Sequence, residues 1–144
     1  MTQEEKQLLL IDLCARLPYG VRVKIFDESI LMEESNNEKG TLYGKETMGD
    51  DCFVIKCKSN DSWIISCEDF KPYLRPMSSM TEEERNEYFD FRNQELQRVA
   101  FAEIGRESAI AEISDWLNAH QLDYRGLIPM GLALEAKDGM YKIK

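Results

Sequence analysis

The sequence changes its periodicity twice, and these changes limit the folds that the chain can adopt. Between residues 21 and 67, apolar and polar residues alternate over short stretches, which is typical of half-buried strands. Over 3–16, and again from 82 to 120, apolar residues recur three and four positions apart, which is typical of amphipathic helices. The sequence therefore predicts an α+β protein with an N-terminal helix, a strand-rich region and a C-terminal helical subdomain.

The strand-rich region is expected to form a small SH3-like antiparallel β-barrel or a curled antiparallel sheet. Its last two strands form a hairpin with apolar residues on both faces, since Phe53 and Ile55 alternate with Val54. A sheet that is apolar on both faces is either closed into a barrel or covered by helices. The strands are expected at 21–26, 41–44, 52–58 and 62–67, with some extended structure at 30–32, a polar loop at 33–40 and a turn at 48–51.

Two prolines shape the segment that follows these strands. Pro72 and Pro76 lie four positions apart within 70–76. Proline lacks the backbone N–H that a helix or a central strand uses. We therefore expect 70–76 to close the barrel without forming a regular helix or a central strand.

Capping signals place the starts of two helices. Thr2 is followed three positions later by Glu5, which is the capping-box pattern. The same pattern recurs from Thr81 to Glu84. Helices are predicted at 3–16, 82–104 and 107–120, a further short helix at 124–134, and a polar tail or short extended segment at 139–144.

No flexible linker separates the strands from the later helices. We assign residues 1–77 to the N-terminal helix and the small β-barrel, and residues 78–144 to the helical subdomain. The two parts are expected to pack as one compact unit.

The chain is strongly acidic, and this argues against one class of ligand. It has 27 Asp and Glu against 18 Lys and Arg, so that its formal net charge is −9. Such a chain repels a phosphate backbone, and no five consecutive residues hold more than two Lys or Arg. We do not expect direct nucleic-acid binding, although a local basic patch in the folded chain and a surface that imitates DNA both stay open.

The four cysteines do not have the spacing of a zinc site. Cys14, Cys52, Cys57 and Cys67 are separated by 37, 4 and 9 residues, whereas zinc sites favour pairs such as C-x2-C. We expect buried structural thiols and no metal, and leave a nucleophilic cysteine as the less favoured alternative.

A single histidine limits the available chemistry. His120 falls near the end of a predicted helix, where a solvated histidine interacts favourably with the helix dipole. The sequence has no G-x-S-x-G turn and no glycine-rich phosphate loop. We therefore expect no catalytic residue and no cofactor.

The location is predicted from two absences in the sequence. The polar start over 1–6 differs from a secretory signal, and no apolar run approaches the ~20 residues that cross a bilayer. We expect a cytoplasmic protein without membrane contact.

Two stretches, 72–77 and 123–127, combine tyrosine with arginine. Both residue types are favoured at interface hot spots. The alternative is that the tyrosines anchor loops onto the core. The predicted interaction surface consists of Tyr73, Arg75, Asp123, Tyr124 and Arg125.

The same stretches carry a resemblance to a known group. The sequence resembles a family of short uncharacterised proteins from gut Bacteroidales genomes, phages and mobile elements. The resemblance implies a bacterial mobile-element or phage setting, but it implies no activity and no functional residues. The matching segments are 12–21, 72–84, 115–118 and 123–140, about a third of the chain.

Together these observations favour a non-enzymatic protein-interaction module that binds a protein partner, with homo-oligomerisation left open. The alternative is a nucleic-acid-linked role, either as a DNA mimic or as a local binder of nucleic acid. A cysteine-dependent enzyme is the third and least favoured hypothesis.

Overall fold

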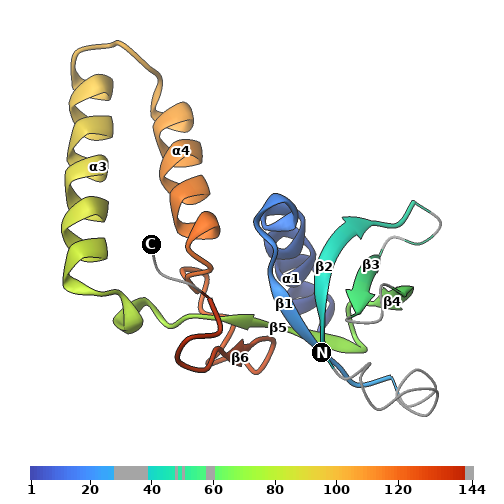
Figure 1. Ribbon diagram of the computed structural model, residues 1–144. Coiled ribbons are helices and arrows are strands. Elements are labelled where there is room, and N and C mark those ends of the chain that lie inside the picture. Colours follow the sequence, from blue (N-terminus) through green and yellow to red (C-terminus); the bar gives the residue numbers. More distant parts are fainter. Residues whose placement is uncertain (28–38, 48, 50, 58–60, 142–144) are drawn as a thin grey trace.

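Figure 1 shows a computed structural model that describes residues 1–27, 39–47, 49, 51–57 and 61–141. The extended stretch expected at 30–32 lies outside these residues, as do most of the loop expected at 33–40 and half of the turn expected at 48–51. The elements in chain order are α1 (Gln3–Ala15), η1 (Leu17–Tyr19), β1 (Arg22–Ile25), β2 (Lys39–Lys45), β3 (Cys52–Cys57), β4 (Ser62–Ser66), β5 (Phe70–Leu74), η3 (Met77–Ser79), α3 (Glu82–Ala100), α4 (Arg106–Ala119) and β6 (Leu134–Glu135).

Both predicted capping boxes are confirmed. The hydroxyl of Thr2 accepts a hydrogen bond from the backbone N–H of Glu5 at 3.1 Å, and the Glu5 carboxylate accepts one from the Thr2 N–H at 3.0 Å. Thr81 and Glu84 make the same two bonds at the start of α3. Because these bonds satisfy N–H groups that have no partner within the helix, each helix begins where the sequence predicts.

The strands form one six-stranded sheet in the order β4-β3-β2-β1-β5-β6. The first five strands pair antiparallel, whereas β6 is parallel to β5, so the sheet is mixed. The α+β class with an N-terminal helix and C-terminal helices is confirmed, but the SH3-like barrel is not. Since β5 pairs with β1 on one side and with β6 on the other, the sheet of the described residues continues past β5 and stays open.

The expectation that 70–76 contains no central strand is wrong. Residues 70–74 form β5, and Pro72 lies opposite Val23 of β1. The N–H of Phe26 donates to the carbonyl of Asp69 at 2.8 Å, and hydrogen-bonded and non-hydrogen-bonded pairs alternate along an antiparallel ladder. Pro72 therefore falls at a non-hydrogen-bonded pair with its nitrogen facing away from β1, and pairing with β6 begins one residue later, at Tyr73.

The core lies between α1 and one face of the sheet (Figure 1). In β1, Val23 and Ile25 are fully buried, and the residues between them face the other way. The rings of Phe53 and Phe70 meet edge to face, with centroids 5.9 Å apart. Further core residues are Leu9, Leu13, Val21, Leu42, Ile55, Ile65, Leu74, Leu127 and Leu132.

The helices α3 and α4 form a hairpin that projects beyond the β5–β6 end of the sheet (Figure 1). α3 ends at Ala100, four residues earlier than predicted, and the chain turns through Ala102, whose φ is +58°. One strand of the sheet, β6, belongs to the part of the chain that was assigned to the helical subdomain. Both assigned parts therefore contribute strands to the sheet.

The short helix expected at 124–134 is wrong, because these residues form turns that lead into β6. Gly126 and Gly131 have φ of +78° and +76°, a left-handed conformation that a continuing helix does not contain. The Asp123 carboxylate holds the first turn, since it accepts a hydrogen bond from the backbone N–H of Leu127 at 2.8 Å.

Arg75 joins β5 to both helices of the hairpin. Its guanidinium forms a bidentate ion pair with Glu84 at 2.7 and 2.9 Å, and both side chains are buried. The same group donates to the carbonyls of Ser79 at 3.3 Å and His120 at 3.2 Å. Hydrogen bonds from Arg75 lower the pKa of Glu84 to about 2.

We expect Glu84→Gln to lower the free energy of unfolding at neutral pH by roughly 3 kcal/mol, because it leaves the Arg75 guanidinium buried without its counter-charge. The folded-state pKa of Glu84 is about 2, below the ordinary value of 4.5, so the stabilisation is present above pH 4.5 and is lost as the pH falls towards 2. Urea unfolding of the wild type and the variant should therefore converge in this acid range.

Glu83→Gln is the matched control, because Glu83 is exposed in the same helical turn and its replacement removes the same charge. Equal unfolding free energies for Glu83→Gln and Glu84→Gln at neutral pH would contradict the assigned role of the pair.

Candidate functional site

The five residues predicted as an interaction surface lie in two places. Arg75 and Asp123 are joined through the backbone, since the Asp123 N–H donates to the Arg75 carbonyl at 2.8 Å. Tyr73 lies beside the C-terminal segment, where its carbonyl accepts a hydrogen bond from the Tyr141 hydroxyl at 2.7 Å. Tyr73, Arg75 and Asp123 are buried, whereas Tyr124 and Arg125 are half-buried.

Tyr124 and Arg125 contact the C-terminal half of α1. Asp12 pairs with Arg125 at 3.1 Å and with Arg16 at 2.8 Å, and the side chains of Asp12 and Arg16 are fully buried. The guanidinium carbons of Arg16 and Arg125 lie 5.4 and 4.9 Å from the centroid of the Tyr124 ring, within the range of cation–π attraction. This segment is thus anchored inside the molecule, and a contact with a partner stays a prediction.

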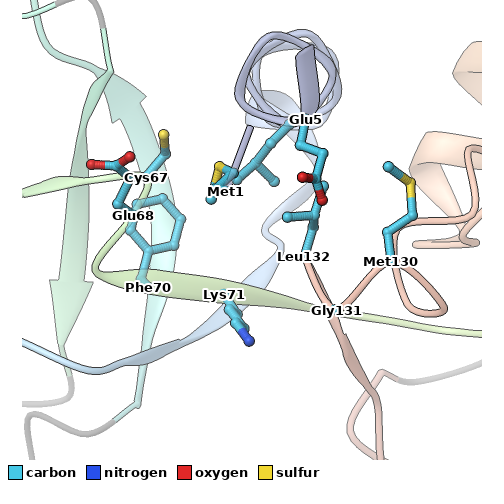
Figure 2. Close-up of a pocket in the computed structure, with 10 residues that line it drawn as sticks. Met1, Glu5, Cys67, Glu68, Phe70, Lys71, Met130, Gly131 and Leu132 are labelled. Atoms are coloured by element: carbon cyan, nitrogen blue, oxygen red, sulfur yellow. The ribbon is translucent and has the colours of Figure 1, made fainter. Parts of the chain in front are cut away.

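A second set of residues, which the sequence did not single out, gathers on the face of the sheet opposite α1. Side chains alternate along a strand, so the residues between the buried positions of β1, β3 and β5 point to this outward face. Figure 2 shows this at β5, where Lys71 and Phe70 point to opposite sides. We call the set the basic face, and it consists of Arg22, Lys24, Lys39, Lys56 and Lys71.

The register of the sheet places like charges directly opposite one another. Lys24 on β1 lies opposite Lys39 on β2 and also opposite Lys71 on β5. Like charges in directly opposed positions destabilise a sheet. Lysines on edge strands prevent unwanted strand pairing, but β1, β2 and β5 are interior strands, so that explanation does not apply here. The opposed lysines therefore have a cost in stability that protection of a sheet edge does not explain.

A parallel row on the same face brings an aromatic ring among the cations. Arg22 lies opposite Thr41, and Thr41 lies opposite Lys56. The register between β2 and β3 then shifts by one residue at Tyr43, which is a β-bulge. The Tyr43 ring is 62% exposed, and the Lys56 ammonium lies 4.2 Å from its centroid. The bulge thus presents this ring to solvent beside a cation.

A second exposed ring lies next to the other row. Phe26 follows β1 directly and is 44% exposed. The ammonium groups of Lys24 and Lys71 lie 5.5 and 5.8 Å from its centroid. Cations and exposed aromatic rings therefore alternate across four adjacent strands of the outward face.

The outward face is hollowed and accessible. A depression of about 400 Å³ is lined by residues of β1, β2 and β3 together with the C-terminal segment. Within the described residues, every cation of the basic face except Lys24 lacks an ion-pair partner. Asp61 and Asp69, which precede β4 and β5, lie at the margin. The lining includes Arg22, Lys39, Lys56, Tyr73 and Met140.

The inner side of β5 carries a different hollow, of about 380 Å³ (Figure 2). It lies between the start of α1, the turn from β4 to β5 and the turn at 130–132. Its lining includes the carboxylates of Glu5 and Glu68 and the buried thiol of Cys67. Lys71 also borders this hollow, but its side chain points to the opposite side of β5 (Figure 2), so that the side chains facing the hollow are mainly acidic and apolar.

The geometry does not support cysteine chemistry in the inner hollow. Burial raises the pKa of the Cys67 thiol to about 11, whereas a nucleophilic cysteine requires a lowered pKa.

His120, which was expected to be solvated, is half-buried and stacks on Trp116 with ring centroids 3.8 Å apart. Among the described residues, no three His, Cys, Asp or Glu side chains are placed to hold a metal ion.

Comparisons with known proteins add no homologue. No protein-family model matches the sequence, and neither curated proteins nor solved structures give a significant match. The resemblance to the Bacteroidales family is not tested by these comparisons and stays a prediction. In the part of the chain that the structure describes, no helix has the length and apolarity needed to cross a membrane.

Replacing Lys39 with Gln removes a charge that faces Lys24 across the sheet. We expect the free energy of unfolding, measured with urea at low salt, to rise by roughly 0.5 kcal/mol because cross-strand repulsion is relieved. The gain should fall at about 1 M NaCl, where the Debye length is about 3 Å. Lys137→Gln is the control, since Lys137 is exposed and outside the basic face. A gain of the same size in both variants would show that only net charge matters.

Thiol labelling of the native protein tests the cysteine hypothesis. The expectation of buried thiols is wrong for Cys14, which is exposed, whereas Cys57 and Cys67 are buried. Cys52 is half-buried, and desolvation raises the pKa of its thiol. We expect one rapidly modified thiol per chain, and Cys14→Ser should remove it. Rapid labelling of Cys67 in the folded protein would contradict the raised pKa and would favour a cysteine-dependent enzyme.

Proposed function

We propose that this protein is a non-enzymatic binding module that holds a polyanionic ligand on the outward face of its sheet. The observation that carries the proposal is the row of Lys39, Lys24 and Lys71, which are directly opposed on three interior strands. An anion bound between these ammonium groups replaces their mutual repulsion with attraction. An acidic protein segment and a nucleic acid both present anions in series, so the proposal covers a partner of either kind.

The negative net charge of the chain is compatible with such a site. The Debye length at about 0.1 M ionic strength is about 10 Å, so exposed charges farther away are largely screened. The cations of the basic face lie on four adjacent strands, which are about 4.8 Å apart. The attraction of an anionic ligand to this face therefore depends on the nearby cations. The distant carboxylates repel the same ligand from the rest of the surface.

Binding without catalysis fits the other features of the described chain. The buried thiol of Cys67 has a raised pKa, and the single histidine is stacked on Trp116. In the phage or mobile-element setting that the resemblance implies, a binding module of this kind would act by occupying or recruiting its partner. The residues around Tyr124 and Arg125 stay a second predicted contact for a protein.

Heparin is a suitable first probe because it is a polyanion without bases or a peptide backbone. We expect the wild type to bind a heparin oligosaccharide in calorimetry, with an affinity that falls as salt rises. The double variant Lys39→Glu/Lys56→Glu should weaken binding by at least about tenfold, because two attractive contacts become repulsive.

Arg92→Glu/Arg106→Glu is the matched control. Both arginines are exposed on the helical hairpin, and this variant changes the net charge by the same amount. It should keep most of the affinity. A wild type that does not bind heparin, or an equal loss in both double variants, would overturn the proposal.

A further inference from the structure

We infer that the polyanion held on the basic face is a single-stranded nucleic acid, whose bases stack on the exposed rings of Tyr43 and Phe26. This inference rests on the function proposed above and names the ligand of that same site. The acidic composition predicted no direct nucleic-acid binding, because no basic cluster occurs along the sequence. The present inference replaces that expectation. The folded sheet forms such a cluster from four strands.

The exposed rings distinguish nucleic acid from an acidic peptide. An acidic peptide is held by charge and needs no aromatic surface beside the cations. A single strand needs both, because its phosphates follow a basic groove while its bases stack on aromatic side chains. The Tyr43 ring centroid lies 4.2 Å from the Lys56 ammonium, and the Phe26 ring centroid lies 5.5 and 5.8 Å from those of Lys24 and Lys71. Each ring thus has a cation next to it that can reach the adjoining phosphate.

The shape of the site favours a single strand over a duplex. Specific readers of duplex DNA insert a helix or a β-ribbon into a groove. Here the cations and rings lie on the face of an open sheet, and the neighbouring hollow is about 400 Å³. Unpaired bases can be splayed onto such a surface, as on the sheet of an RNA-recognition domain, whereas the bases of a duplex remain stacked on one another.

The dimensions predict a short binding site. From β3 across β2 and β1 to β5 there are three strand spacings of about 4.8 Å, or about 14 Å. The five cations of the basic face set an upper limit on the phosphate contacts, and over this width we expect about three or four. Three or four phosphate contacts give an expected slope of about −2 to −3 for log K against log salt, since each contact contributes about −0.7 on a single strand.

The test uses the full chain and fluorescence anisotropy with three labelled probes of equal length: an octathymidylate, an octauridylate and an octaglutamate peptide. We expect at least one oligonucleotide to bind more tightly than the peptide. The corresponding duplex should bind more weakly than the single strand. An octaglutamate bound as tightly as both oligonucleotides would overturn the inference and favour an acidic protein segment.

Tyr43 provides the sharper test, because its ring is exposed and its replacement removes no buried contact. Tyr43→Leu should weaken oligonucleotide binding by about tenfold, whereas Tyr43→Phe should retain it, since stacking needs the ring and not the hydroxyl. The affinity for heparin should change little in Tyr43→Leu. The matched control is Phe101→Leu, which removes an exposed ring from the helical hairpin and should leave the affinities unchanged.

Failure of this inference is distinguishable from failure of the proposed function. If heparin binds and both oligonucleotides do not, or if Tyr43→Leu binds oligonucleotides as the wild type does, the single-strand inference is wrong and the polyanion site stands. If neither heparin nor any oligonucleotide binds, both are wrong. Urea unfolding of each variant should match that of the wild type within about 1 kcal/mol, which separates lost binding from lost folding.

Discussion

The buried guanidinium of Arg75 joins the sheet to both helices of the hairpin. It lies at the end of β5, pairs with Glu84 at the start of α3 and donates to the carbonyl of His120 at the end of α4. A guanidinium that has lost its hydration is stable only where several of its N–H groups find acceptors together. This set of donors therefore helps to fix the helical hairpin on the sheet. Two backbone bonds, from Arg75 to Gln121 and from Asp123 to Arg75, continue the junction into the segment that leads to β6.

Buried charged groups on the inner face of the sheet also need partners. Asp12 on α1 and Arg16, which caps the end of α1, have no exposed side-chain surface, and Asp12 also pairs with Arg125. Such pairs add little net stability, but they restrict how α1 and the turns before β6 can dock, because any other arrangement leaves a buried charge unpaired. With both of these elements on the inner side, the alternate residues of β1, β2, β3 and β5 are left on the outward side.

The residues of the outward face destabilise the sheet but are placed where they can bind a ligand. Lysines in directly opposed positions on interior strands destabilise the sheet, and the exposed side chains of Tyr43 and Phe26 add apolar surface beside them. A protein that carries local features of this kind is expected to use them, since residues that break a local rule cluster at functional sites. The inner hollow has no comparable feature: its thiol, Cys67, is buried and protonated, in keeping with a structural role.

Relations that span a few residues could be predicted from the sequence. The capping boxes of α1 and α3, the alternating strands and the α+β class follow from such spacings, and the Tyr/Arg stretches could be identified although not their burial. The strand through Pro72, the parallel partner β6 and the open sheet could not, because each depends on which remote backbone supplies a hydrogen bond. The basic face likewise exists only in the folded chain. The sequence by itself determined that the cations alternate with apolar residues, and only the register between strands decided that Lys24, Lys39 and Lys71 meet, because that register is set by pairing between distant segments.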